Sequence, residues 1–154
     1  MIGASRHKLP ALAFLLGLSG LIPQALAALI AIYPPHAPAA QLAAFLYAAL
    51  ILSFLGGLWW GVAATRPDAP LWIYVVAVVP SLIAFAAGLL GIVRTGSLVQ
   101  PLMIVGVALL STPLIDWQLD RRGLVPERWL TMRLILSLGL GGLTLAIALS
   151  TRVV

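Results

Sequence analysis

Five long apolar runs constrain the fold of this chain more than any other feature. They cover residues 9–32, 39–64, 71–93, 98–119 and 129–150. A bilayer crossing needs about 20 consecutive apolar residues, and each run is long enough. A lone strand cannot satisfy its backbone hydrogen bonds in hydrocarbon, so each run is expected to be a helix. The sequence therefore predicts an all-α integral membrane bundle of five transmembrane helices, forming a single membrane domain over residues 1–154.

The composition agrees with a chain that is surrounded by lipid. Only 8% of the residues are charged and 62% are hydrophobic, whereas a soluble domain carries roughly 25% charged residues. The net charge of +5 could indicate nucleic acid, but the basic residues stand singly or in pairs at the ends of apolar runs. We therefore expect membrane lipids as partners and no nucleic acid. The chain has no cysteine, which excludes disulfides and thiolate chemistry, and we expect no cofactor and no metal.

The distribution of lysine and arginine predicts how the chain is oriented. Seven of the nine such residues fall on one side of the predicted bundle: Arg6, Lys8, Arg66, Arg121, Arg122, Arg128 and Arg133. The other side has Arg94 and Arg152. Because short cytoplasmic loops collect positive charge, we expect the N-terminus inside and the C-terminus outside.

The first apolar run also has features of a secretory signal. It follows a basic start and contains Ala-Leu-Ala at residues 25–27, which is typical of a cleavage site. The apolar run continues past that site, however, so we interpret residues 9–32 as the first transmembrane helix.

Residues 46–61 (LYAALILSFLGGLWWG) form the expected hub of the bundle. Ala49, Ser53, Gly57 and Gly61 recur every four residues, which puts them on one helical face. Small side chains let membrane helices approach closely, so this face is predicted to pack against a neighbouring helix. The adjacent residues Trp59 and Trp60 are expected to point in different directions, one of them into the bundle.

Prolines interrupt three of the predicted helices, at Pro23, Pro80 and Pro113. Each removes one backbone donor and can kink its helix. Transporters use such breaks to expose backbone to a substrate, but kinks can also serve packing alone. The sequence leaves both interpretations open.

Two carboxylates near the end of the fourth run are the main candidates for chemistry. Asp116 and Asp120 are four residues apart and can share a helical face. They could hold Mg²⁺ for a lipid diphosphate, with Arg121 and Arg122 as phosphate ligands, or form a solvated network at the interface. An ionised carboxylate in hydrocarbon is costly, so the deeper Asp116 is expected to pair with Arg66 or Arg133.

The expected basic end combines aromatic and charged side chains suited to an amphipathic ligand. The candidate binding residues there are Trp60, Trp72, Asp116, Trp117, Arg133 and Arg66. No histidine lies within the apolar runs, which excludes a Ser–His pair inside the bundle. No acid or base lies mid-membrane, which argues against a proton relay. We therefore expect no catalytic residues.

Three ordered motifs resemble one family. The hub sequence, the preceding GLSGLIP at residues 17–23 and the later VVPSL at residues 78–82 are similar to the domain-of-unknown-function 3429 family of transmembrane protein 69-like proteins. Asp116-Trp117 fits the same resemblance. It implies a small multi-pass protein of bacterial or mitochondrial inner membranes, and it implies no activity. Relatives carry Arg or His in the W-W-G motif where this chain has Trp59, which puts any role of a charge there in doubt.

Three functional hypotheses follow from the sequence. The preferred one is an accessory, assembly or structural protein of the bacterial inner membrane that packs against a larger membrane complex or another copy of itself. The second is binding or transport of an apolar ligand such as a lipid, quinone or tetrapyrrole. The third is a lipid-phosphate enzyme that uses Asp116 and Asp120.

Overall fold

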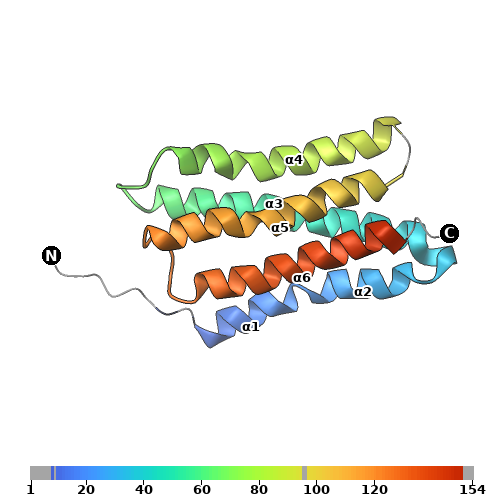
Figure 1. Cartoon of the computed structure of the whole chain (residues 1–154), viewed down its shortest axis with the longest axis horizontal. Coiled ribbons are helices and arrows are strands. Elements are labelled where there is room, and N and C mark those ends of the chain that lie inside the picture. The colour runs from blue at the N-terminus through green and yellow to red at the C-terminus, as the bar shows by residue number, and fades with distance from the viewer. Residues whose placement is uncertain (1–7, 9, 95–96, 151–154) are drawn as a thin grey trace.

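A computed structural model describes residues 8, 10–94 and 97–150. The helices run along one long axis (Figure 1). In chain order they are α1 (Ala11–Ser19), α2 (Ile22–Ala31), the short 3-10 helix η1 (Pro34–His36), α3 (Ala37–Ala64), α4 (Trp72–Arg94), α5 (Val99–Arg121) and α6 (Trp129–Ser150). No strand occurs in the part of the chain that the structure describes.

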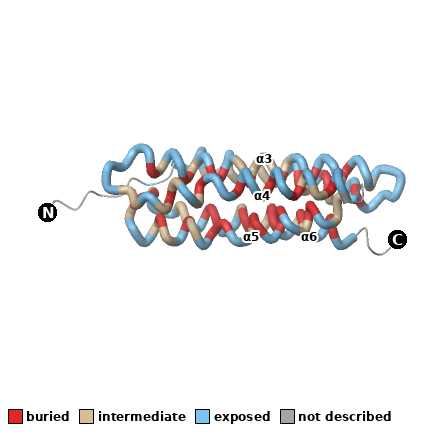
Figure 2. Tube along the Cα trace, turned by 90° about the horizontal axis from the view of Figure 1, so that it is seen from above, coloured by how far each residue is buried: buried red, intermediate tan, exposed pale blue. Residues whose placement is uncertain are grey.

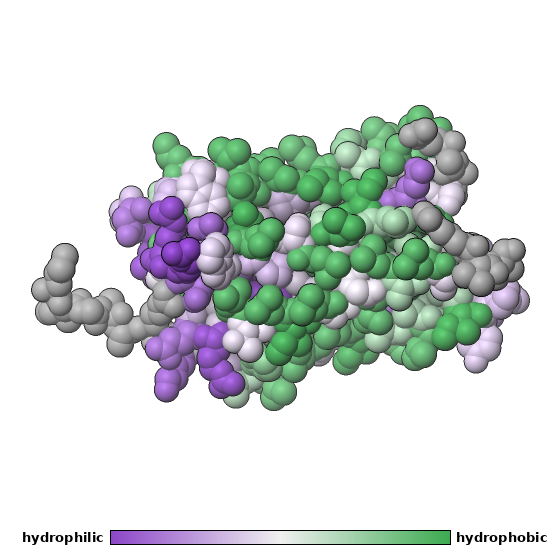
Figure 3. Space-filling view, in the orientation of Figure 1, coloured by the Kyte–Doolittle hydropathy of each residue, from purple (hydrophilic) through white to green (hydrophobic). Residues whose placement is uncertain are grey.

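The described residues contain five segments that are long and apolar enough to cross a membrane. They are Ala11–Ala31, Pro34–Ala64, Trp72–Val93, Val99–Arg121 and Trp129–Ser150. Apolar side chains cover the middle of the molecule, and hydrophilic side chains gather at one end (Figure 3). The expected all-α bundle of five spans is confirmed.

The first span is two helices, where a single helix was expected. The break lies at Gly20 and Leu21, whose amides bond three residues back, to the carbonyls of Gly17 and Leu18 at 3.0 Å each. Pro23 follows in the first turn of α2, where its missing N–H costs little. The Tyr47 hydroxyl of α3 donates to the Gly20 carbonyl at 2.6 Å, so a side chain satisfies a backbone group at the break.

The other two prolines lie inside continuous helices. Pro80 is within α4 and Pro113 is within α5, and both are buried. The helices thus continue through these prolines, and only Pro23 stands beside a break.

Helices α5 and α6 approach closely through glycine. A Cβ on Gly141 would lie 3.0 Å from the Gly106 carbonyl oxygen, and a Cβ on Gly106 would lie 2.8 Å from the Leu145 side chain. Buried residues concentrate where the helices face one another (Figure 2). Close backbone approach through small residues is the packing expected of membrane helices.

Within the described chain, the hub helix packs through a different face from the one predicted. Gly57 and Gly61 are exposed, and a Cβ on either would meet nothing within 4 Å. Ala49 and Ser53 are half-buried. The close approach is at Gly56, where a Cβ would overlap the Ala77 carbonyl oxygen of α4. Close approach within the described chain therefore occurs one residue away from Gly57, about 100° around the helix, and contact of the Gly57 and Gly61 face with another membrane helix stays a prediction.

Backbone contacts join the segments that meet at the charged end of the molecule. The backbone of Lys8 pairs with that of Glu127, which ties the start of the chain to the α5–α6 loop. Helix α5 ends with Gly123 at φ 69°, and the Leu124 amide reaches back to the Leu119 carbonyl at 3.1 Å. This left-handed cap turns the chain towards α6.

Part of the predicted charge asymmetry can be followed in the structure. Hydrophilic side chains cluster where α1 and α6 begin and where α3 and α5 end (Figures 1 and 3). Arg6 and Arg152 lie outside the described residues, as does the side chain of Arg94. The side of the membrane on which this end lies stays a prediction.

Candidate functional site

Asp116 is the centre of a polar network inside the charged half of the bundle. It is fully buried and accepts hydrogen bonds from three side chains on two other helices. Oδ1 accepts from the indole nitrogens of Trp59 and Trp129, both at 3.1 Å. Oδ2 accepts from Nε of Arg133 at 2.9 Å, and the two form a buried ion pair. The expected pairing of Asp116 is confirmed, and its partner is Arg133.

The chain positions these donors by simple helical spacing. Trp129 and Arg133 are four residues apart at the start of α6, so both lie on the face that meets α5. Trp59 reaches the same carboxylate from α3. Its side chain is 3% exposed while that of Trp60 is 48% exposed, which confirms that the two point in different directions. Each hydrogen bond to a charged group contributes about 1.5–3 kcal/mol, and together they offset the cost of burying the carboxylate.

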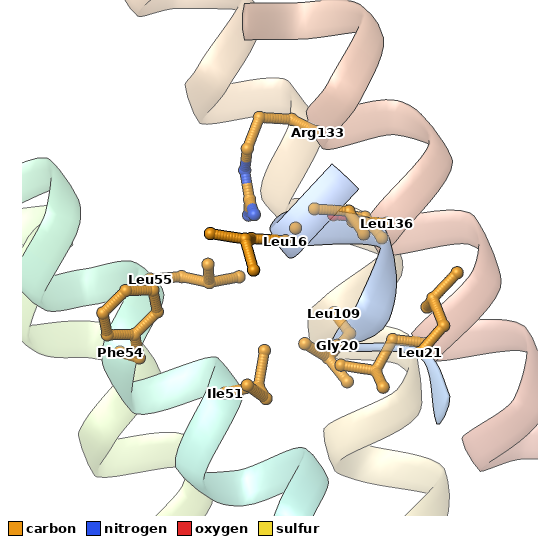
Figure 4. A pocket seen from close by; sticks show the side chains of 12 residues that line it. Leu16, Gly20, Leu21, Ile51, Phe54, Leu55, Leu109, Arg133 and Leu136 are labelled. Carbon is orange, nitrogen blue, oxygen red and sulfur yellow. The ribbon is translucent and has the colours of Figure 1, made fainter. Parts of the chain in front are cut away.

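One nitrogen of the Arg133 guanidinium is left without a partner. Nη2 is buried and has no hydrogen-bond partner among the described residues. Figure 4 shows the guanidinium directed towards Leu16, and both residues line a cavity. A buried donor without an acceptor costs on the order of 1–3 kcal/mol, more when it is charged. The donor without an acceptor distinguishes this cavity from an ordinary packing defect.

The cavity into which Arg133 points lies between α1, α3, α5 and α6, and we call it the Arg133 cavity. Its volume is about 210 Å³. Apart from Arg133 and Ser137 its lining is leucine, isoleucine, phenylalanine and glycine. Leu16 and Phe54 in that lining are 63% and 60% exposed, so its mouth opens on the lipid-facing surface between α1 and α3.

A second cavity of similar size lies between α3, α4 and α5, and we call it the Pro80 cavity. Its volume is about 240 Å³. Its hydroxyls are already used, because Ser111 donates to the Ala108 carbonyl at 2.7 Å and Thr112 to the Leu109 carbonyl at 2.8 Å. This cavity therefore has space for a ligand, but its hydroxyls are not free to donate a hydrogen bond to one.

The other predicted binding residues do not line the Arg133 cavity. Trp60 packs edge-on against Tyr74 with ring centroids 5.0 Å apart. The guanidinium carbons of Arg121 and Arg122 lie 4.7 Å and 5.9 Å from the ring centroids of Trp117 and Trp72. Neither the Arg133 cavity nor the Pro80 cavity is lined by Trp60, Trp72 or Trp117, and a role of these residues in binding stays a prediction. Arg66 is exposed and is not the ion-pair partner of Asp116.

The arrangement gives no support to a metal-assisted phosphate site. Both carboxylate oxygens of Asp116 are bound by protein donors, while Asp120 is half-buried nearer the end of α5. Within the described ranges, no three His, Cys, Asp or Glu side chains come together.

Sequence reasoning missed two parts of the site. The sequence does not identify Trp59 and Trp129 as partners of Asp116, yet both donate to it. The four-residue spacing of Trp129 and Arg133 could have indicated a shared acceptor. No sequence signal points to Ser137, which bonds Thr112 at 2.9 Å and lines the cavity.

The five apolar spans and the buried ion pair define a multi-pass membrane protein. The chain belongs to the family described as Protein of unknown function (DUF3429), whose match covers residues 9–150. It is 40% identical over 107 residues to transmembrane protein 69 of Xenopus tropicalis, an alignment that covers 65% of this chain and 41% of that protein. The chain thus spans less than half the length of this relative. No solved structure shows a significant match.

Proposed function

We propose that this protein binds an apolar ligand from the bilayer in the Arg133 cavity. The observation that carries the proposal is the buried guanidinium of Arg133, which is directed into an apolar cavity and whose Nη2 has no partner among the described residues. A ligand with an apolar body and one polar group would fill the space and satisfy this nitrogen.

The size of the cavity limits what the ligand can be. Its volume of about 210 Å³ is below the roughly 300–1,000 Å³ of typical ligand pockets. Such a space accepts one ring or a length of chain, and the rest of a longer molecule would lie in lipid beyond Leu16 and Phe54. A lipid or a quinone suits these dimensions better than a tetrapyrrole macrocycle.

The location that we propose is the bacterial inner membrane, with the charged end towards the cytoplasm. Support comes from the excess of lysine and arginine at one end of the chain. In this orientation Arg133, one turn inside α6, would lie near the cytoplasmic headgroups. Reporter fusions at the two termini should then report opposite compartments, and reports from the same compartment would contradict this topology.

Two matched substitutions test ligand binding. Ile51→Phe adds an aromatic ring to the lining of the Arg133 cavity, and Ile83→Phe does the same in the Pro80 cavity. Native mass spectrometry after gentle extraction should detect a bound small molecule in the unmodified protein and in Ile83→Phe. Ile51→Phe should lose it. The proposal would be contradicted if the unmodified protein carried no bound molecule, or if both variants retained the molecule equally.

A second candidate function rests on the exposed face of α3. A Cβ on Gly57 or Gly61 would meet nothing within 4 Å, so another membrane helix could approach here closely. The partner would be a larger membrane complex or a second copy of this chain, in an accessory or structural role. Gly57→Leu should abolish co-purification of the partner while leaving the stability of the protein unchanged. Repeated recovery of the chain alone in mild detergent would contradict this role.

A further inference from the structure

We infer that the polar group of the ligand is a neutral carbonyl, as in a lipid-soluble quinone, ketone or ester, and that the ligand is not an anion. This inference rests on the proposed function, because it specifies the ligand of the Arg133 cavity. It depends on three features of the site: which hydrogen-bond donor lacks an acceptor, which charges are already paired, and how polar and apolar side chains are distributed along the cavity.

The donor of Arg133 that has no partner requires an acceptor on the ligand. A guanidinium has only donors, and its Nη2 is the unpartnered group. The neighbouring hydroxyls do not change this requirement. Thr112 donates its proton to the Leu109 carbonyl, so in the 2.9 Å contact between Thr112 and Ser137 the donor is Ser137. Arg133 therefore supplies the free donor that a ligand in this cavity would meet.

The charge of Arg133 is already matched. Asp116 is fully buried and lies 2.9 Å from Nε of Arg133, so the pair is neutral as a unit. A carboxylate or phosphate in the cavity would add a negative charge with no cation of its own, and an unpaired charge in an apolar interior costs several kcal/mol. A carbonyl oxygen accepts the same hydrogen bond without that cost.

Polarity along the cavity matches such a molecule. Arg133 stands one turn inside the start of α6, about 6 Å along the axis from Trp129. Leu140 lines the cavity two turns further on, about 10 Å deeper. On the other side Leu21 lies at the break between α1 and α2. A carbonyl head at Arg133 would thus stand near the charged end, with its apolar tail towards the middle of the bilayer.

Three probes of similar shape test the inference: decylbenzoquinone, the decylbenzoate anion and decylbenzene. They carry a neutral acceptor, an anionic acceptor and no acceptor. Their affinities for the full chain in micelles are measured by native mass spectrometry titration. Decylbenzoquinone should bind about tenfold to a hundredfold more tightly than decylbenzene, as one hydrogen bond to a charged donor allows. Decylbenzoate should bind no more tightly than decylbenzene.

A conservative variant assigns the preference to the guanidinium. Arg133→Lys keeps a cation for Asp116 but removes Nη2, so the affinity for decylbenzoquinone should fall to that for decylbenzene. Arg121→Lys makes the same change on an exposed residue outside the cavity and should leave all three affinities unchanged. If Arg133→Lys does not fold, the three affinities of the unmodified protein still decide the question.

The outcomes separate this inference from the proposed function. Tightest binding of decylbenzoate would overturn the choice of a neutral ligand. Equal binding of all three probes, blocked by Ile51→Phe, would overturn the need for an acceptor while supporting an apolar ligand site. No binding of any probe, or binding that Ile51→Phe does not affect, would overturn both.

Discussion

Two buried polar side chains, one in each half of the bundle, show different ways of placing polarity inside a membrane protein. Asp116 in the charged half accepts from two indoles and a guanidinium. Gln24 in the opposite half, also fully buried, donates from Nε2 to Thr144 at 2.9 Å, while its Oε1 has no partner among the described residues. The first group is charged with both oxygens bonded, and the second is neutral and half satisfied.

This difference indicates in which half the stability of the bundle depends on polar contacts. Removing one partner of a buried ion pair leaves an uncompensated charge, whereas removing a neutral amide leaves its partner with other bonds. Thr144 also donates to the Leu140 carbonyl at 2.7 Å, so it does not depend on Gln24. We therefore expect the charged half to be sensitive to substitution and the opposite half to be tolerant.

The largest effect should follow from breaking the ion pair. Asp116→Ala should lower the free energy of unfolding by about 3–5 kcal/mol, because the buried Arg133 charge loses its counter-ion. Thermal unfolding in detergent micelles measures the change. Replacing both partners, as in Asp116→Asn with Arg133→Gln, should cost less than Asp116→Ala alone. A double variant at least as unstable as the single one would contradict this account.

Loss of a single indole donor should have a smaller effect. Trp59→Phe keeps an aromatic ring but removes the hydrogen bond to Asp116, at a cost of about 1.5–3 kcal/mol in unfolding free energy. The adjacent Trp60→Phe is the control, since Trp60 is 48% exposed, and it should change stability by about 0.5 kcal/mol or less. Equal effects at the two positions would mean that the indole nitrogen of Trp59 is unimportant.

The packing that holds α3 near α4 can be tested one turn from Trp59. A Cβ on Gly56 would overlap the Ala77 carbonyl oxygen, so Gly56→Ala should lower the free energy of unfolding by about 1–3 kcal/mol. Gly57→Ala should leave it unchanged or raise it by up to about 1 kcal/mol, because the added methyl meets nothing within 4 Å and alanine favours a helix. Chemical unfolding of both variants checks the contrast, and the reverse order would refute the assigned packing face.

The smallest effect should come from the opposite half. Gln24→Leu removes a buried carbonyl oxygen that has no partner, while Thr144 keeps its bond to Leu140. Unfolding free energy should change by about 1 kcal/mol or less. A loss as large as that of Asp116→Ala would erase the proposed difference between the two halves.

Local sequence rules gave most of the architecture and part of the site. The lengths of the apolar runs predicted the five spans, and the cost of a charge in hydrocarbon predicted an ion pair for Asp116. The same rules did not identify Gly56 as the point of close approach to α4, because small residues allow close packing but do not say where the neighbouring helix lies. They also did not identify Trp59 and Trp129 as donors to Asp116, since an indole can bond a headgroup or a buried carboxylate equally well.

The sequence by itself determined that this chain lies in a membrane, where its five membrane spans lie to within a few residues, and that one end is strongly basic. These properties depend on composition and on short-range spacing, which a single helix already expresses. The tertiary structure decided that Arg133 rather than Arg66 meets Asp116, that Gly56 faces α4, and that the guanidinium of Arg133 is directed into an apolar cavity. Those outcomes depend on how helices distant in sequence rotate and approach one another, and a rotation of about 100° per residue is enough to exchange a buried side chain for an exposed one.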